Sequence, residues 1–294
     1  MNNTVAVVVT YNRKKLLRQN IEKLLDQTTP CDIYIVDNAS SDGTKEMVAG
    51  FADERIHYFN TGSNLGGAGG FEFGTRVGVQ DGYKYVWLMD DDTLPEKNAL
   101  AELYKADKKL CGDWGWLSSV AYWTDGSICR MNIQKRNIFK HICSKEYNSS
   151  IAPIKMCSFV SLLVKSDVIK ELGLPIGEYF IWTDDYEFTG RISRMYPCYL
   201  VTASRVIHAM KMHIRVDLAH DSADRIERYH YIYRNDIHCY RQYGFLGWVY
   251  IIFKDCYTVV RVLLESPTDK AKKVGVIIKG FREGLCFNPH INFV

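Results

Sequence analysis

The stretch YVWLMDDDT, residues Tyr85–Thr93, decides the fold and the chemistry of this chain. Its apolar part predicts a buried strand, and three aspartates stand at the carboxyl end of that strand. Ligands of open α/β sheets bind in the crevice beyond the strand ends. Adjacent carboxylates repel one another unless a cation lies among them, and Mg²⁺ and Mn²⁺ bridge carboxylates to substrate phosphates. The run therefore predicts a metal–diphosphate site; the alternative is an acidic turn before a helix that begins at Pro95.

Composition and charge exclude several classes of protein. The 294 residues, 47% of them hydrophobic and 24% charged, can form one large domain or two small ones. The first residues lack the pattern of a secretory signal, and the nine cysteines include no Cys-x-x-Cys pair, which argues against a zinc ribbon and fits reduced thiols in the cytosol. The net charge of +3 comes from residues 254–294. That excess is too small for a nucleic-acid-binding surface.

Strand and helix patterns alternate along the first half of the chain. Apolar runs at residues 4–9, 33–36 and 55–59 predict strands, with helical spacing at 16–25 and 44–51 between them. This order predicts βαβ units and a mostly parallel sheet. Further on, the sequence predicts helices over 95–108 and 225–243 and strands over 116–122, 199–202 and 205–207. We expect residues 130–152, which are polar and basic, to form a mobile loop over the site.

Glycines gather between residues 60 and 71, beside a predicted helix start. Glycine lets the backbone approach a ligand closely, and a helix N-terminus favours phosphate. A dinucleotide-binding fingerprint is disfavoured, because its third glycine would fall at Glu72 and the loop follows the third strand rather than the first. A flexible turn is the remaining alternative.

A second acidic cluster follows three aromatic residues in the stretch 179–187. It contains Asp184, Asp185 and Glu187. Burial against aromatic rings can raise the pKa of a carboxylate and make it a usable base. The alternative is a set of acidic residues that favour the start of a helix, and both can hold at once. His208 follows a predicted strand and is a candidate metal ligand, with His213 as the competing choice.

These motifs form an ordered pattern that resembles the inverting family 2 glycosyltransferases. The pattern consists of Thr10–Arg13, Asp37–Ser40, Asn64–Gly66, Asp90–Asp92 and Asp184–Glu187. The resemblance implies an α/β fold of the GT-A type, Rossmann-like with a mostly parallel sheet and flanking helices, followed by a C-terminal helical segment. It also implies a nucleotide-sugar donor, bound by Thr10, Asn12, Arg13, Asp37, Asn64, Gly66, Gly67 and Asp91.

A narrower resemblance is to the galactofuranosyltransferases, on the loop 64–71, the three aspartates and the later acidic pair with its histidine. It implies that Mn²⁺ or Mg²⁺ is held by Asp90, Asp92 and His208. Asp185 would be the base, with Asp184 as the alternative because Thr183 separates the aromatic residues from the acidic pair. Residues expected to contact the acceptor are Trp182 and Glu187.

The function implied is the metal-dependent, inverting transfer of a sugar, with galactofuranose from UDP-galactofuranose favoured. The acceptor would be a glycan or a lipid-linked saccharide in bacterial cell-surface polysaccharide synthesis. Rhamnosyltransferases that use dTDP-rhamnose are the main alternative, since they share the outer motifs and a segment similar to Tyr231–Asn235. A different class, a non-catalytic nucleotide-binding module, would not need the second acidic cluster. A nucleotidyltransferase would normally carry glycine after the first strand, where this chain has Thr10–Arg13.

We expect two regions, a GT-A domain over residues 1–244 and an amphipathic, basic helical region over residues 245–294. The start of the second region, 245–253, is rich in large apolar residues. It predicts a segment that lies in a membrane interface, with a core helix as the alternative. Attraction to anionic lipid is expected from Lys270, Lys272, Lys273, Lys279 and Arg282. The predicted location is cytoplasmic, peripheral on the inner face of the plasma membrane.

Overall fold

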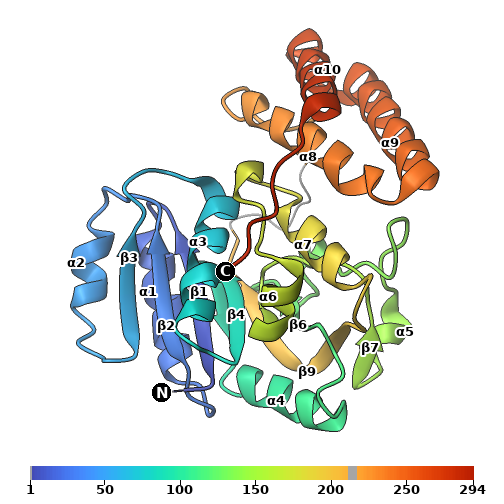
Figure 1. Ribbon diagram of the computed structural model, residues 1–294. Helices are drawn as coiled ribbons and strands as arrows, with labels where there is room; N and C mark the ends of the chain where they lie inside the picture. The colour runs from blue at the N-terminus through green and yellow to red at the C-terminus, as the bar shows by residue number, and fades with distance from the viewer. Residues whose placement is uncertain (1, 211–216) are drawn as a thin grey trace.

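A mixed β-sheet with helices on both faces forms the centre of the structure, a computed structural model that describes residues 2–210 and 217–294 (Figure 1). Within these residues the strand order is β3-β2-β1-β4-β8-β6-β9-β5, and β7 pairs with β9. The first four strands of this order are parallel to one another, whereas β8 is antiparallel to both β4 and β6. The strands are β1 (Thr4–Thr10), β2 (Asp32–Asp37), β3 (Ile56–Asn60), β4 (Tyr85–Asp90), β5 (Thr93–Pro95), β6 (Trp116–Tyr122), β7 (Ile151–Pro153), β8 (Leu162–Lys165) and β9 (Tyr199–His208).

Alternate residues of β1 face opposite sides of the sheet, as the period of a strand requires. Val5 and Val7 pack in the core beside α3 and α6, and Ala6 and Val8 pack in the core beside α1, α2 and α4. The predicted α/β architecture with a C-terminal helical segment is therefore confirmed. Its helices are α1 (Lys14–Leu25), α2 (Thr44–Ala49), α3 (Gly66–Gln80), α4 (Ala99–Lys109), α5 (Ser144–Tyr147), α6 (Ser166–Leu172), α7 (Asp184–Ile192), α8 (His230–Arg241), α9 (Gly244–Glu265) and α10 (Lys270–Cys286), with 3₁₀ turns η1 (Arg130–Asn132), η2 (Gly177–Tyr179) and η3 (Ile226–Tyr229).

A row of glycines explains the close packing of α3 on β1. A Cβ atom at Gly70 or Gly74 would lie 2.5 or 2.4 Å from the nearest side-chain carbon of Val9 or Val7. Real Cβ contacts are longer, so the helix could not sit at this depth with alanine at these positions. Within the glycine cluster seen in the sequence, Gly70 therefore serves helix–strand packing, and Gly74 continues this contact along α3.

Three local predictions are wrong. Pro95 does not begin a helix: it ends β5, whose residues pair with β9, and α4 begins four residues later. Residues 199–207 are one strand with an irregularity rather than two strands. The segment 130–152, expected as a mobile loop, contains η1, α5 and the start of β7, and it buries apolar side chains such as Ile138 and Ile142.

Helices α8, α9 and α10 pack together as a helical unit that stands apart from the sheet in Figure 1. After α10 the chain leaves this unit and returns to the sheet domain, where Arg76 Nη1 donates to the carbonyl of Phe293 at 2.8 Å and Leu174 N donates to Asn292 O at 2.8 Å. Lys273, one of the lysines expected to attract lipid, is buried and donates to Ala219 O at 2.9 Å, so that expectation is wrong for this residue. None of the helices in the described part of the chain is long and apolar enough to cross a bilayer.

Candidate active site

The register of the sheet brings the sequence motifs to one edge. Thr10 pairs with Asp37 on β2, and Val9 pairs with Asp90 on β4. These residues end neighbouring parallel strands, so their side chains meet beyond the carboxyl edge of the sheet. His208 arrives from β9, where it pairs with Thr93 of β5. The antiparallel pairing of β5 with β9 thus carries the histidine back to the aspartates.

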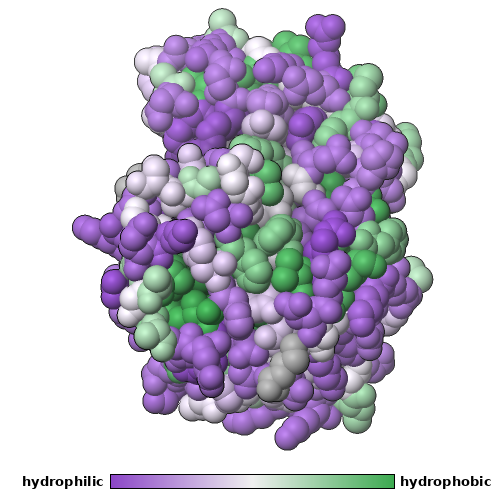
Figure 2. Space-filling model, turned by 60° about the vertical axis from the view of Figure 1, so that its left-hand side comes forward, coloured by the Kyte–Doolittle hydropathy of each residue, from purple (hydrophilic) through white to green (hydrophobic). Residues whose placement is uncertain are grey.

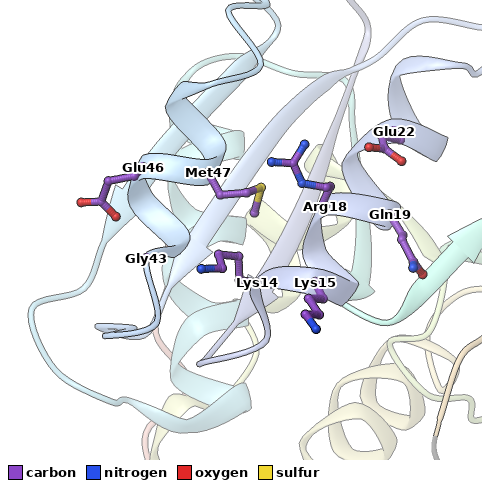
Figure 3. A pocket seen from close by; sticks show the side chains of 8 residues that line it. All are labelled: Lys14, Lys15, Arg18, Gln19, Glu22, Gly43, Glu46 and Met47. Carbon is purple, nitrogen blue, oxygen red and sulfur yellow. The ribbon is translucent and has the colours of Figure 1, made fainter.

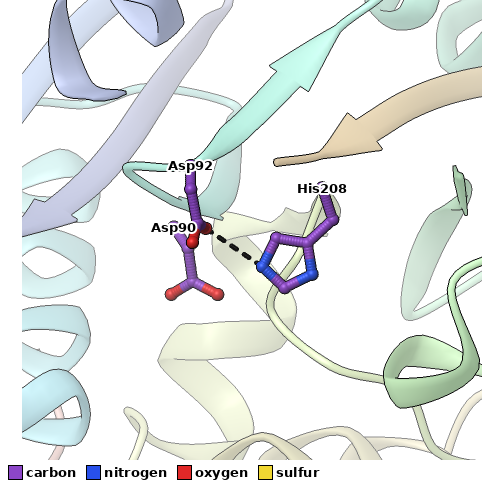
Figure 4. Close-up of side chains that lie close together, drawn as sticks. All are labelled: Asp90, Asp92 and His208. Carbon is purple, nitrogen blue, oxygen red and sulfur yellow. Dashed lines mark ion pairs between the residues drawn. The ribbon is translucent and has the colours of Figure 1, made fainter. Parts of the chain in front are cut away.

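Asp90, Asp92 and His208 form a cluster whose potential ligand atoms all lie within 4.8 Å of one another (Figure 4). His208 Nε2 is 3.0 Å from Asp92 Oδ1. Within the described residues this is the one group of three or more such side chains close enough to share an ion. Two carboxylates and an imidazole suit a divalent cation such as Mn²⁺.

The orientation of the His208 ring is set from outside the cluster. Asn132 donates from Nδ2 to Ser158 Oγ at 2.8 Å, so its Oδ1 faces His208 Nδ1, 2.7 Å away, and accepts the ring proton. Nε2 then faces Asp92 Oδ1 across 3.0 Å. It carries a proton when the ring is charged and a lone pair when the ring is neutral. A divalent cation would take the place of that proton, with Nε2 and the carboxylate as ligands, so these residues suit the predicted metal.

Burial and mutual charge shift the pKa values of this cluster. Desolvation by burial and the neighbouring Asp92 raise the pKa of Asp90 to about 6. For His208, burial lowers the pKa, but the carboxylate of Asp92 outweighs it and raises the value to about 10. The cluster therefore holds positive charge strongly, whether as a proton or as a metal ion.

Arg13 and Thr10 bind the middle aspartate. Thr10 Oγ1 donates to Asp91 Oδ2 at 2.8 Å, and Arg13 Nη1 lies 3.1 Å from Asp91 Oδ1 and 2.8 Å from Asp92 Oδ2. Asp91 is almost inaccessible to solvent. Asp91 is thus bound within the fold, and its contact with the donor stays a prediction. The half-exposed side chain of Arg13 remains open to a ligand.

Asn12 and Asp37 organise the loops after β1 and β2. Asn12 has a positive φ of 54°, and its Oδ1 accepts from Ser41 N at 2.8 Å. Asp37 is fully buried, with Oδ1 accepting from Ser40 N at 2.8 Å and Oδ2 from Tyr58 at 2.6 Å. Like Asp91, Asp37 is therefore bound within the fold and does not present its carboxylate to solvent.

The N-terminus of α3 lies against the loop that leads to the second acidic cluster. Asn64 Oδ1 accepts from Gly66 N at 2.9 Å, and Gly66 has a φ of 73°. A Cβ at Gly66 would lie 2.1 Å from the carbonyl oxygen of Phe180, so only glycine fits there. Gly67, in contrast, has open space where a side chain would be. A ligand can therefore approach the first turn of α3 at this glycine.

The loop between η2 and α7 is strained. Phe180, Trp182 and Thr183 all have positive φ values, between 63° and 68°. Such a conformation is costly for residues with a Cβ, and it persists only where surrounding contacts enforce it. The strained loop ends at Asp184, the first residue of α7.

Helix α8 supplies the contacts that enforce the strained loop. The side-chain amide of Asn235 donates to the carbonyl oxygens of Tyr179, Ile181 and Trp182 at 3.0, 3.0 and 2.9 Å. Asp236 Oδ1 accepts from Thr183 Oγ1 at 2.7 Å, and its other oxygen pairs with a lysine of α9, Lys254. The helical unit therefore fixes the loop that positions the acidic pair.

Asp184 and Asp185 begin α7 and lie near the first cluster. Burial raises the pKa of Asp184 to about 7 and that of Asp185 well above its ordinary value. The charge of Asp90 raises both pKa values further, so the two acidic clusters are close enough to interact. Such groups can accept a proton near neutral pH, which is what a general base needs.

The two predicted acceptor contacts differ in the structure. Glu187 is buried, and both of its oxygens accept from Arg191, at 2.9 and 3.1 Å. This ion pair binds Glu187 within the fold, and its contact with the acceptor stays a prediction. The half-buried Trp182 packs on Tyr229, with 5.2 Å between the ring centres, at the junction of the strained loop and the helical unit.

Several contributors were missed from the sequence, and the segment 130–152 supplies two of them. Asn132 orients His208, as described above. Lys135 is buried, and its Nζ donates to the hydroxyl of Tyr240 at 2.6 Å and lies 4.6 Å from the ring centre of Tyr186. Burial lowers the pKa of Lys135 to about 8, and its charge in turn lowers that of Asp185. His213, which the sequence offered as the alternative to His208 as a metal ligand, lies outside the described residues.

A separate groove lies between α1 and α2 (Figure 3). It has a volume of about 640 Å³ and contains none of the predicted site residues. Lys14 Nζ is bound to the carbonyl oxygen of Asp42 at 2.6 Å. The groove therefore does not extend the cluster of Figure 4. Its lining consists of Lys14, Lys15, Arg18, Gln19, Glu22, Gly43, Glu46 and Met47.

The sequence of this chain matches the family model of "Glycosyl transferase family 2" over residues 5–168, which include β1 to β4 and the aspartates. The chain belongs to glycosyl transferase family 2. It is 25% identical over 204 residues to the galactofuranosyltransferase GlfT1 of Mycolicibacterium smegmatis, covering 64% of this chain and 65% of that protein. It is 28% identical over 200 residues to GlfT1 of Mycobacterium tuberculosis, covering 64% of each. The chain thus matches less than two thirds of the length of these relatives.

The fold is also that of solved glycosyltransferases. The structure of GalNAc-T7 with UDP, GalNAc and Mn²⁺ superposes with a TM-score of 0.59 at 14% sequence identity, covering 94% of this chain and 54% of that one. At this identity the likeness concerns the fold alone. Together with the family match, it confirms the GT-A fold predicted from the motifs.

Proposed function

We propose that this member of glycosyl transferase family 2 is a metal-dependent, inverting glycosyltransferase. The observation that carries this proposal is the meeting of two acidic clusters, Asp90 and Asp92 with His208, and Asp184 with Asp185. A non-catalytic nucleotide-binding module would need the first cluster but would gain nothing from buried carboxylates with raised pKa values beside it. The relatives named above support the same class.

The proposed reaction is a single displacement at the anomeric carbon of the donor. A divalent cation held by Asp90, Asp92 and His208 would neutralise the diphosphate leaving group. Asp185, or Asp184, takes the proton from the attacking hydroxyl of the acceptor. Arg13 would contact the donor phosphates, a role supported by its half-exposed guanidinium next to the aspartates. One displacement inverts the configuration.

The favoured donor is UDP-galactofuranose, and the favoured acceptor is a glycan or a lipid-linked saccharide of bacterial cell-surface polysaccharide synthesis. The names of the two GlfT1 relatives support the sugar, and the loop of residues 64–71 was the sequence feature that suggested it. A rhamnosyltransferase using dTDP-rhamnose is the second candidate. Its supporting feature is the Tyr231–Asn235 segment, whose Asn235 holds the strained loop.

A donor screen tests the proposal. UDP-galactofuranose, UDP-galactopyranose and dTDP-rhamnose are each incubated with the full chain and a panel of alkyl glycosides, with Mn²⁺, with Mg²⁺ and with EDTA. Nucleoside diphosphate release and the mass of the glycoside product are measured. We expect product from UDP-galactofuranose and the metal. Product from dTDP-rhamnose alone would reverse the choice of donor, and tight binding of UDP without product from any donor would favour the non-catalytic module.

A further inference from the structure

The helix α9 has its charged side chains on the side that faces the protein. Lys254 pairs with Asp236, Arg261 pairs with Asp217 at 3.1 Å, and Asp255 is buried. The outer side of the same helix, between its first and last residues, bears no charged side chain. This distribution is the reverse of that expected for a helix on the surface of a water-soluble domain.

The exposed residues of α9 form one continuous apolar face. Spaced at 3.6 residues per turn, they fall within an arc of about 140° that runs the length of the helix. Several are largely exposed: Phe245 is 80% accessible, Phe253 75% and Leu264 77%. The members of this apolar face are Phe245, Leu246, Val249, Ile252, Phe253, Cys256, Tyr257, Val260, Leu263 and Leu264.

The width of the apolar face distinguishes between possible occupants. A partner helix covers a narrow seam of two positions in every seven residues. The apolar face of α9 uses three or four positions in every seven, so a second copy of α9 would leave much of it in water. A lipid layer is broad and covers the whole arc. Large apolar side chains such as Phe253 also suit the boundary between headgroups and acyl chains.

Charge on the neighbouring helix favours the same occupant. The exposed charged side chains of α10 are mostly basic: Lys270, Lys272, Lys279 and Arg282, with one partly buried glutamate, Glu283. Two of these bases meet surface carboxylates, Lys272 with Glu227 at 3.3 Å and Lys279 with Glu283 at 4.0 Å. Such exposed pairs are weak. The side of the helical unit turned forward in Figure 2 is mainly hydrophilic, so the unit as a whole is amphipathic.

We propose that the apolar face of α9 docks onto an anionic lipid surface, with α9 lying in the plane of the headgroups. The consequence for the site follows from the inner side of the helix. Lys254 of α9 pairs with Asp236, which accepts from Thr183 Oγ1, directly before Asp184. A bilayer bound at α9 would therefore be linked through two side-chain contacts to the strained loop. Binding of α9 to lipid would be the same whichever sugar the enzyme transfers.

The test measures flotation of the full chain with vesicles of phosphatidylcholine and phosphatidylglycerol, and with vesicles of phosphatidylcholine alone. Phe253→Asp and Leu246→Asp each place a carboxylate on the apolar face. The matched control is Met195→Asp, because Met195 is a 66% exposed apolar residue of the sheet domain. Circular dichroism and the melting temperature establish that each variant is folded, and sedimentation velocity without lipid gives the oligomeric state.

We expect the wild-type chain and the Met195→Asp variant to float with the anionic vesicles. The vesicle-bound to free ratio should fall about ten-fold or more for Phe253→Asp and for Leu246→Asp. Flotation on phosphatidylcholine alone should be weaker, since the basic side chains of α10 then lack an anionic partner. Absence of flotation, or equal flotation of all variants, overturns the proposal. A wild-type dimer that Phe253→Asp converts to a monomer, without flotation of either, assigns the apolar face to a second copy instead.

Discussion

The side-chain amide of Asn235 donates a 2.9 Å hydrogen bond to the backbone carbonyl of Trp182, in a loop where three residues have positive φ. The same amide reaches two further carbonyls of this loop. Because the loop ends at Asp184, the geometry of the acidic pair depends on a residue of another helix. Asn235 is thus a positioning residue for the proposed reaction.

The first prediction concerns Asn235→Ala. The variant should lower kcat by roughly 10- to 100-fold, because relaxation of the loop misplaces the acidic pair. The free energy of unfolding should fall by about 1–3 kcal/mol, since buried carbonyls lose their donor. Gln242→Ala, which removes an exposed amide directly after α8, serves as the matched control. Equal kcat values for both variants would show that the loop holds its shape without Asn235.

The second prediction concerns the metal. Activity should stop in excess EDTA and return with Mn²⁺ or Mg²⁺, and Asp92→Asn should nearly abolish it. Asn132→Ala should weaken the affinity for Mn²⁺ by about 10- to 100-fold, because the His208 ring loses the partner that orients it. Titration calorimetry with Mn²⁺ measures this directly. Asn148→Ala is the control, since Asn148 is exposed on the same segment. Full turnover in EDTA would remove the cation from the mechanism.

The third prediction concerns the base. Asp185→Asn should lower kcat by about 10²–10⁴-fold, while binding of UDP, followed by calorimetry, is retained. Asp167→Asn is the control, because Asp167 lies in the first turn of α6 and its side chain is 95% exposed. If Asp184→Asn proves the more damaging change at equal stability, the role of the base moves to Asp184.

The fourth prediction is a pH profile. A general base works only when it is deprotonated, so activity should fall as the pH drops below its pKa. Burial raises the pKa of Asp184 to about 7 and raises that of Asp185 well above its ordinary value. The logarithm of kcat/KM should therefore decline on the acidic side with a slope of about one, starting near neutral pH rather than near pH 4. A profile that stays flat down to pH 5 would contradict the assignment of the base to Asp184.

The fifth prediction concerns Asp255, a buried residue of α9 whose two carboxylate oxygens receive no hydrogen bond. Burial raises its pKa to about 7, above the unfolded value of 3.8. The stabilisation by protonated Asp255 is therefore fully present below pH 4. As the pH rises above 4 and through 7 this stabilisation is lost, and the free energy of unfolding falls by up to about 4 kcal/mol. Asp255→Asn should raise the melting temperature at pH 8 more than at pH 5. Asp113→Asn, at an exposed position, should leave the melting temperature unchanged at both pH values. Equal shifts of the melting temperature in both variants would contradict the raised pKa of Asp255.

The sequence was sufficient to predict the fold and the first acidic cluster, for a physical reason. Parallel strands align their carboxyl ends, so polar residues after each apolar run must meet at one edge. Asp90 and Asp92 were placed in this way, and the GT-A sheet followed from the alternation of strands and helices. The helix expected at Pro95 failed because pairing of Thr93 with His208 extends the chain as a strand up to the proline, which has no N–H to continue it.

The contributors missed from the sequence act through tertiary contacts that no local pattern records. Asn132 lies in a segment whose sequence has no regular period. It orients the His208 ring only because the fold brings this segment into contact with the end of β9. Asn235 belongs to a motif visible in the sequence, but its carbonyl partners are more than fifty residues away. The ion pair of Glu187 with Arg191, one helical turn later, could in contrast be read from their spacing in the sequence.

The close packing of the α3 glycines on β1 holds the N-terminus of α3, at the predicted donor site, in a fixed position. A Cβ at Gly74 would come within 2.4 Å of Val7 Cγ1, and one at Gly78 within 2.8 Å of Val5 Cγ1. A glycine-to-alanine substitution at either position, two or three helical turns after the start of α3, would therefore push α3 away from the sheet. Because Gly66 and Gly67 begin this helix, the mouth of the site would widen with it. The width of the entrance is thus determined by packing on the strand, and a change made to stabilise the core there would alter ligand binding.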